Sequence, residues 1–330
     1  MEVKQAKITA VGHYLPEFKM TNFEFEKIMD TNDEWIRSRT GISERRILKD
    51  PDKATAFMGA EAAKEALKNA NLDAADLDLI IVATVTPDYM FPATACLVQN
   101  MIGAEKAFAF DLSAACSGFL YALSTGSMYI EAGRAKKVLV IGADKMSSII
   151  DYTDRTTSIL FGDGAGAVVL EEATDGMGLI DQIHYTEGDV NCSLYQHAGG
   201  SLNPATQETV DAGQHYLSQD GRAVFKKATM GMADVSLEIM KKNNLDPDDI
   251  AWLVPHQANL RIIEATANRM GLSSEKVMIN INKYGNTTSG TIPLCLYDWQ
   301  DKLNYGDNII LAAFGGGFTW GAIYLKWGIK

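Results

Sequence analysis

The sequence is poor in cysteine, in positive charge and in long apolar runs. Its 330 residues include 4 cysteines, widely separated and without a C-x-x-C pair, so we expect neither a zinc site nor a disulfide framework. Lysine and arginine number 30 against 42 acidic residues, and this net charge of −12 argues against general nucleic-acid binding. The hydrophobic share of 47% and the charged share of 22% are those of an ordinary globular chain.

No uninterrupted apolar run approaches the roughly 18 residues that a membrane-spanning helix needs. The first residues, MEVKQAKITAVGHY, lack the apolar core of a secretion signal and lead directly into a strand-like pattern. We therefore expect a cytoplasmic protein that binds neither a membrane nor a nucleic acid.

Apolar strand-like runs alternate with helical patterns along the chain, which indicates an α/β fold with buried sheets. The predicted strands are 78–84, 107–112, 137–143, 251–256, 277–282 and 308–314. One predicted helix begins after Asn32, a favourable N-cap residue, and ends before Gly41.

The second half of the chain repeats the first. Segments 68–87, 105–110 and 161–170 are echoed in the same order by segments 241–260, 275–280 and 314–325. A nearly constant offset predicts one duplicated unit with two similar halves, residues 1–175 and 176–330, packed sheet against sheet. The first half carries an extra segment at about 144–160.

One cysteine stands in a context that favours chemistry. Cys116 lies in a loop of small residues that leads into a helix, and a helix N-terminus is expected to lower the pKa of its thiol. The offset of the 105–110 echo places Asn286, in a similar loop, opposite Cys116, so we expect the two to be neighbours. The other three are interpreted as packing or loop residues: Cys96, Cys192 and Cys295.

A nucleophile needs partners. Among the five histidines, His256 stands at the end of an apolar run, and strand ends in α/β sheets face ligand crevices. The glycines of FGGGF (314–318) leave backbone N–H groups free to bind an oxyanion.

Six motifs in order resemble those of β-ketoacyl-acyl-carrier-protein synthase III, the initiating condensing enzymes of bacterial fatty-acid synthesis. They are TNDEWIRSRTGISERR (31–46), DLSAACSGFLYAL (111–123), DYTDRTTSILFGDGAG (151–166), VPHQANLRI (254–262), YGNTTSGTIP (284–293) and FGGGFTWG (314–321). The resemblance implies a thiolase-like αβαβα fold. It also implies no cofactor, because acyl-coenzyme A is a substrate.

The resemblance further implies a catalytic triad of Cys116, His256 and Asn286. Cys116 takes an acyl group from a short acyl-coenzyme A, and malonyl-acyl-carrier protein then loses carbon dioxide to give an enolate that attacks the acyl-enzyme. His256 and Asn286 donate hydrogen bonds to the malonyl thioester oxygen. The backbone N–H groups of Cys116 and Gly316 form the oxyanion hole for acyl transfer.

Substrate contacts follow from the same resemblance. Trp35 and Arg155 enclose the adenine ring of coenzyme A, and Asn259 binds its pantetheine arm. Phe91 crosses the interface of a homodimer to close the partner's acyl pocket. The residues alone leave two alternatives open: Trp35 as a half-buried helix-face aromatic and Phe91 as an ordinary core residue.

The carrier protein of this family is acidic, so a chain of net charge −12 must gather positive charge locally to bind it. Four residues are expected near the pocket mouth: Lys226, Lys227, Arg261 and Arg269. The polar segment 188–217 is expected near the pocket as well, where it tunes specificity for a primer that the sequence does not define.

Three other functions remain open. A related condensing enzyme of secondary metabolism would keep the same triad. A biosynthetic thiolase is disfavoured because FGGGF lacks the second catalytic cysteine of those enzymes. A non-catalytic carrier-protein-binding subunit is disfavoured because Cys116 is intact.

Overall fold

The computed structural model describes residues 4–330, so the first three residues of the predicted first half lie outside it. Its helices are α1 Asn22–Phe25, α2 Asp33–Thr40, α3 Thr55–Ala70, α4 Thr94–Ile102, α5 Gly118–Glu131, α6 Gln207–Asp211, α7 Gly221–Lys242, α8 Leu260–Met270, α9 Ile281–Tyr284 and α10 Thr291–Trp299. Its strands are β1 Gln5–Tyr14, β2 Lys19–Thr21, β3 Glu44–Arg46, β4 Leu79–Ala83, β5 Phe108–Leu112, β6 Lys137–Asp144, β7 Gly164–Ala173, β8 Gly178–Thr186, β9 Leu194–Gln196, β10 Leu217–Gln219, β11 Trp252–Pro255, β12 Asn308–Gly315 and β13 Thr319–Lys326.

Two sheets of the same design form the centre of the molecule. The first has the strand order β1-β7-β6-β4-β5 and the second the order β8-β13-β12-β11. In each sheet the inner strands are parallel (β4 to β6, β11 to β12) and the outer ones are antiparallel. Every residue of β4 is buried, because both faces of its sheet are covered.

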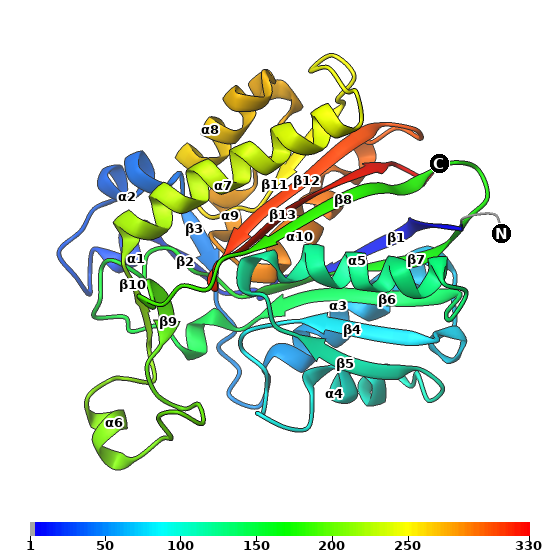
Figure 1. The fold of residues 1–330 in the computed structure, drawn as a ribbon. Helices are drawn as coiled ribbons and strands as arrows, with labels where there is room; N and C mark the ends of the chain where they lie inside the picture. The colour runs from blue at the N-terminus through cyan, green and yellow to red at the C-terminus, as the bar shows by residue number, and fades with distance from the viewer. Residues whose placement is uncertain (1–3) are drawn as a thin grey trace.

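The layers alternate in the order αβαβα (Figure 1). α5 and α10 lie between the two sheets, within an apolar core to which both sheets contribute. α3 and α4 cover the outer face of the first sheet, and α7 and α8 cover the outer face of the second. The predicted thiolase-like layering is confirmed.

The predicted strand at 277–282 is wrong. Only one parallel bridge, between Val277 and Leu253, continues the second sheet at this point. The chain then turns into α9, whereas the equivalent segment of the first half forms β5. The second sheet therefore has four strands where the first has five.

This local difference changes the correspondence between the halves. The 3-10 turn Ala115–Ser117 leads into α5, and the 3-10 turn Thr288–Gly290 leads into α10 in the same way. Ala115 and Thr288 both have positive φ, 47° and 53°. The structural counterpart of Cys116 is therefore Ser289, and the prediction that Asn286 is its counterpart is wrong in register by three residues.

The predicted helix after Asn32 is α2. The Asn32 side chain accepts a hydrogen bond from the Trp35 N–H, and the helix ends at Gly41, whose φ of 82° favours glycine. Within residues 4–330, no helix is long and apolar enough to cross a membrane.

Candidate active site

Cys116 lies in a turn that the second sheet holds in place. The Ser117 hydroxyl donates to the Thr319 carbonyl at 2.8 Å, and the Thr319 hydroxyl donates to the Ala114 carbonyl at 3.0 Å. Gly315 approaches this turn so closely that a Cβ there would lie 2.7 Å from the Cys116 nitrogen. Only glycine permits this backbone contact between the two halves.

His256 follows β11 and is 2% exposed. Its Nδ1 lies 2.7 Å from the Thr291 hydroxyl, and its Nε2 has no hydrogen-bond partner among residues 4–330. Burial lowers the pKa of His256 to about 3, so the imidazole is neutral at physiological pH. A neutral ring with one free nitrogen is available to a substrate.

Asn286 is held by its backbone and by its side-chain oxygen. Its N–H donates to the Leu160 carbonyl at 2.9 Å, and its carbonyl accepts from the Gly162 N–H at 3.0 Å. The Thr288 N–H donates to Asn286 Oδ1 at 2.8 Å. With Oδ1 occupied in this way, the amide NH₂ is left as a hydrogen-bond donor.

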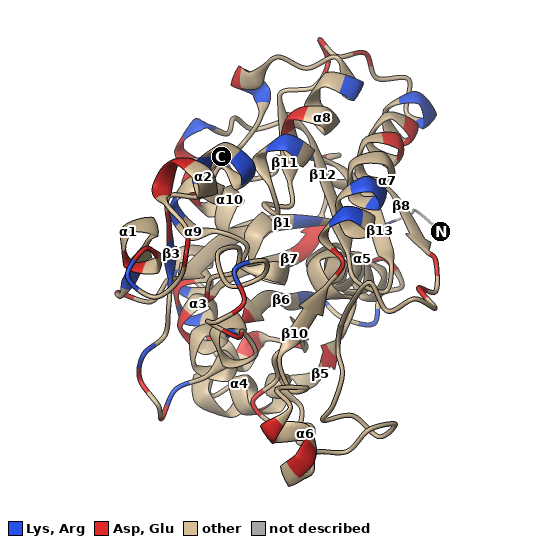
Figure 2. Cartoon of the chain, turned by 90° about the vertical axis from the view of Figure 1, so that its left-hand side faces the viewer, with Lys and Arg blue, Asp and Glu red and all other residues tan. Residues whose placement is uncertain are grey.

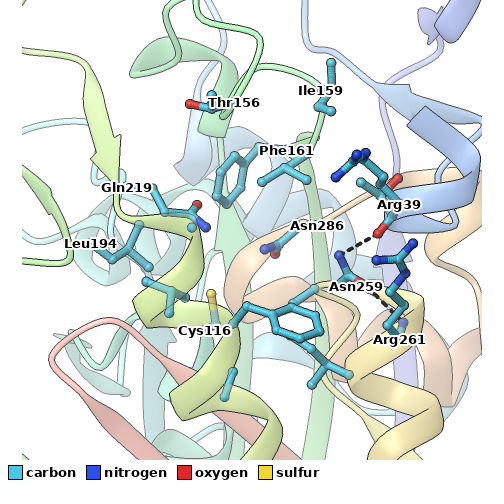
Figure 3. Close-up of a pocket in the computed structure, with 18 of the residues that line it drawn as sticks. Arg39, Cys116, Thr156, Ile159, Phe161, Leu194, Gln219, Asn259, Arg261 and Asn286 are labelled. Atoms are coloured by element: carbon cyan, nitrogen blue, oxygen red, sulfur yellow. Dashed lines mark hydrogen bonds between the residues drawn. The ribbon is translucent and has the colours of Figure 1, made fainter. Parts of the chain in front are cut away.

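These three side chains, Cys116, His256 and Asn286, line one cavity of about 520 Å³, which we call the first cavity. Figure 3 shows Cys116 and Asn286 facing the same space, with Arg39, Asn259 and Arg261 on one side of it. The structure therefore brings the predicted triad together, although its members come from both halves of the chain.

The thiol of Cys116 does not have the lowered pKa predicted from the helix N-terminus. Burial raises its pKa to about 12, and the negative charge of Asp144 contributes further in the same direction. A hydrogen bond from the Asn286 side chain and backbone donation lower the pKa by less. The expectation fails because the side chain is 7% exposed and loses more from desolvation than it gains from the turn.

A second cavity of about 410 Å³ opens beside Cys116. Gly316 lines this second cavity, close to the nucleophile as predicted from the Gly-rich turn. Segment 188–217, expected near the pocket, contributes a wall through β9 and through Leu217 of β10. Its apolar lining is Val85, Met146, Ile149, Phe161, Leu194 and Leu217.

Two of the predicted coenzyme A contacts, Trp35 and Arg155, meet at the mouth of the first cavity. The Arg155 guanidinium lies 4.9 Å from the Trp35 ring centre, and Arg39 lies 5.0 Å from the same ring. A planar ring bound between Trp35 and Arg155 requires Arg155 to move away. Asn259 also lines the cavity, where its Oδ1 caps α8 and its Nδ2 donates to the Arg39 carbonyl at 3.0 Å.

Phe91 is not a core residue, so that alternative is wrong. Its side chain is 86% exposed, and its neighbours Tyr89 and Met90 are 61% and 81% exposed. It lines none of the cavities described for this chain. Its predicted partner site, if it exists, lies on another molecule.

The four predicted carrier-protein residues divide into two pairs. Lys226 and Arg261 line the first cavity. Lys227 forms an ion pair with Glu187 at 2.7 Å, and Arg269 forms one with Asp234 at 3.2 Å, so both are locally neutralised. Lys and Arg residues gather on α2, α7 and α8 in Figure 2, whereas α6 carries acidic residues.

Sequence reasoning missed four residues that the structure places at or near the site. Arg39 and Arg222 line the first cavity and add two positive charges to its mouth. Thr291 contacts His256, and Asp144 lies beneath the Cys116 turn. Arg39 stands inside the matched motif 31–46, but polar side chains that act only through another residue leave no pattern in one sequence.

Comparison with known proteins decides the family. Residues 110–188 match the model of 3-oxoacyl-acyl-carrier-protein synthase III, and residues 240–327 match the model of its C-terminal part. The β-ketoacyl-acyl-carrier-protein synthase III of Chlorobium luteolum is 59% identical over 98% of this chain and 99% of its own length. The chain belongs to the β-ketoacyl-acyl-carrier-protein synthase III family.

Other members of the synthase III family agree. A synthase III of Bacteroides thetaiotaomicron is 52% identical over 99% of this chain and 98% of its own length. The crystal structure of the synthase III from Aquifex aeolicus superposes with a TM-score of 0.89 at 45% identity, over 98% of this chain and all of that one. The protein is an acyltransferase of the condensing type, and its condensation initiates fatty-acid synthesis.

Proposed function

We propose that this synthase III joins a short acyl-coenzyme A primer to malonyl-acyl-carrier protein in the cytoplasm, without a cofactor, and that Cys116, His256 and Asn286 are its catalytic residues. One observation carries the assignment of the residues. A buried thiol, a neutral imidazole and an amide donor open into one cavity, and its mouth is positively charged. This arrangement suits a nucleophile that accepts an acyl group and donors that stabilise an enolate.

In the first stage, the Cys116 sulfur attacks the carbonyl carbon of the primer thioester. The C–S bond to coenzyme A breaks, coenzyme A leaves as its thiol with the proton from Cys116, and an acyl-enzyme remains. The backbone N–H groups of Cys116 and Gly316 bind the transient oxyanion. The acyl chain enters the second cavity, whose apolar lining matches a hydrocarbon.

In the second stage, malonyl-acyl-carrier protein occupies the first cavity. Its carboxylate leaves as carbon dioxide, and the bonding electrons form an enolate on the thioester. His256 and Asn286 donate hydrogen bonds to the enolate oxygen. The enolate carbon attacks the acyl carbon, the bond to the Cys116 sulfur breaks, and a β-ketoacyl-carrier protein leaves.

The substrates' phosphate groups bind at the mouth. Its positive side chains are Arg39, Arg155, Arg222, Lys226 and Arg261. Trp35 and Arg155 open to take the adenine ring between them, and Asn259 lies along the path of the pantetheine arm. The acidic carrier protein docks over Lys226 and Arg261, with Lys227 and Arg269 beside them, and its prosthetic arm reaches down the same cavity.

The working unit in this proposal is a homodimer. β5 is the free edge of the first sheet, and Phe108 of β5 and Met101 of α4 are 48% and 47% exposed. A sheet edge of this kind, next to the exposed apolar loop that carries Phe91, is suited to a second copy of the chain. In the dimer, Phe91 reaches into the partner's acyl pocket.

The same chemistry would serve secondary metabolism. The priming β-ketosynthase of the R1128 polyketide pathway superposes with a TM-score of 0.91 at 32% identity, over 99% of this chain and 97% of that one. The choice of primer separates the two roles, since the fold and the triad serve both.

The test is turnover with a panel of straight and branched acyl-coenzyme A primers of increasing length, each with malonyl-carrier protein. The proposal expects label from at least one primer to remain on the protein and to appear in a β-ketoacyl-carrier protein. The matched control is Cys116→Ala, which should carry no label. Equal labelling of the control and the wild type would contradict the assignment.

A further inference from the structure

Asp144 is a buried carboxyl group that the proposed mechanism does not use. It ends β6 and is fully buried, in the first half of the chain, directly beneath the turn that carries Asn286. Within residues 4–330, its hydrogen bonds come from Thr84, Val85, Thr86 and Ser289, and none from a lysine or arginine. The adjacent Lys145 turns its ammonium to the Lys53 carbonyl at 2.7 Å.

The duplication gives this position a meaning. Asp144 corresponds to Gly315, because each ends the equivalent strand of its sheet, and Ser289 corresponds to Cys116. Gly315 touches the Cys116 turn with bare backbone, whereas Asp144 touches the Ser289 turn with a carboxyl group. The second nucleophile position of the duplicated unit therefore holds a serine tied to a buried acid.

The hydrogen-bond geometry around Ser289 shows where a proton must lie. The Ser289 hydroxyl oxygen is 2.6 Å from Asp144 Oδ2 and 2.7 Å from the Ala83 carbonyl oxygen. A serine hydroxyl has one proton and can make only one of these contacts as donor. If Asp144 were ionised, the other contact would set two unprotonated oxygens against each other.

The contacts are satisfied when Asp144 carries the second proton. Its Oδ2–H then donates to the Ser289 oxygen, and the Ser289 O–H donates to Ala83. The other carboxyl oxygen, Oδ1, remains an acceptor for the Val85 N–H at 2.8 Å, the Thr86 hydroxyl at 2.9 Å and the Thr84 hydroxyl at 3.0 Å. Burial also raises the pKa of Asp144, which is the direction this arrangement needs.

The same contacts connect Asp144 to the active site. Ser289 follows Thr288, whose N–H holds Asn286 Oδ1 at 2.8 Å. Asp144 thus fixes the turn that fixes the orientation of the Asn286 amide. A negative charge on Asp144 would raise the pKa of the Cys116 thiol and oppose the enolate, so its neutral form suits both stages of the reaction.

We propose that Asp144 is a neutral carboxylic acid in the folded enzyme, and that through Ser289 it is a positioning residue for Asn286. The inference about Asn286 rests on the proposed function, whereas the inference about the proton rests only on the hydrogen bonds. The two parts are therefore tested separately.

The proton is tested by infrared difference spectra and by alkylation of Cys116. Wild type minus Asp144→Asn should show the carbonyl band of a protonated carboxylic acid, and the pH profile of Cys116 alkylation by iodoacetamide should be the same in both proteins. A missing band, or a profile that shifts to lower pH in Asp144→Asn, overturns the proposal. If Asp144→Asn does not fold, Ser289→Ala replaces it, because loss of the serine acceptor must shift the same band. An unshifted band then overturns the proposal.

The positioning role is tested on the two partial reactions of Ser289→Ala. We expect acylation of Cys116 by the primer to change little, and loss of carbon dioxide from malonyl-carrier protein to fall at least about tenfold, because one aligned donor is lost. The matched control is Asp163→Asn, which removes another buried carboxyl group, one that contacts Ser147 and Leu48 rather than Ser289. An unchanged decarboxylation in Ser289→Ala, or an equal loss in the control, overturns the positioning role. Failure of both partial reactions in the wild type would instead count against the proposed function.

Discussion

The Thr291 hydroxyl lies 2.7 Å from His256 Nδ1 and 3.1 Å from the Thr288 carbonyl oxygen. It has one proton for these two acceptors. When the proton goes to Nδ1, the shorter contact, the neutral imidazole carries its own proton on Nε2, which has no partner in the described chain. The free nitrogen is then the donor that decarboxylation needs.

Replacement of Thr291 should therefore impair the second stage of the reaction alone. In Thr291→Val, loss of carbon dioxide from malonyl-carrier protein should fall about 100-fold, because the histidine tautomer is no longer set and a transition-state donor is lost. Thr291→Ser keeps the hydroxyl and should stay close to wild type. Parallel loss of acylation and decarboxylation in Thr291→Val would show a general structural role, and ¹⁵N spectra of His256 report the tautomer directly.

The free Cys116 thiol should react slowly at neutral pH. Burial raises its pKa to about 12, so the thiolate is scarce at pH 7 and its fraction rises about tenfold with each pH unit below that value. The rate of alkylation by iodoacetamide should still be rising well above pH 9. Cys116→Ala supplies the background from the exposed Cys96 and Cys192, and a plateau near neutral pH would refute the raised pKa.

Charge reversal at Arg261 should distinguish the two substrates. Arg261→Glu places a negative charge where the acidic carrier protein docks, so use of malonyl-carrier protein should weaken at least about tenfold more than use of acyl-coenzyme A. Arg134→Glu makes the same charge change at an exposed position outside the described cavities and should have little effect on either substrate. Equal losses for both substrates in Arg261→Glu would contradict carrier docking at this residue.

The exposed loop at Phe91 should matter to assembly. Phe91→Asp puts a charge where the proposed dimer buries an aromatic ring, so the protein should sediment as a monomer or as a weakened dimer, with reduced acylation. Val190→Asp changes another highly exposed apolar residue, 91% exposed, and is the matched control. A wild-type protein that sediments as a monomer, or a Phe91→Asp protein with unchanged mass and acylation, would refute the interface.

Much of the fold was predictable because duplication and buried strands leave strong patterns. The two-sheet layering and α2 with its Asn32 cap follow from those patterns. The register between the halves was not predictable, because α9 replaces a strand and the second half is locally longer before Thr288. The correct counterpart of Cys116, Ser289, is visible only once α5 and α10 are aligned.

The site shows a similar division. The nucleophile and its two partners stand in distinctive motifs, so the sequence alone brings them together. The pKa of the thiol, the exposure of Phe91 and the ion pairs of Lys227 and Arg269 depend on what surrounds each side chain. Those surroundings are assembled from distant segments, and one sequence contains no signal for them.

The central claim is that one cavity divides its work between Cys116, which carries the acyl group, and the pair His256 and Asn286, which drives decarboxylation. The most direct measurement is to follow both partial reactions, acyl label on the protein and carbon dioxide from malonyl-carrier protein, in Cys116→Ala, His256→Ala and Asn286→Ala. The account predicts that Cys116→Ala loses the label but still releases carbon dioxide. The other two should keep the label and lose about 100-fold or more in decarboxylation. Label retained on Cys116→Ala, or carbon dioxide released at the wild-type rate by His256→Ala and Asn286→Ala, would contradict it.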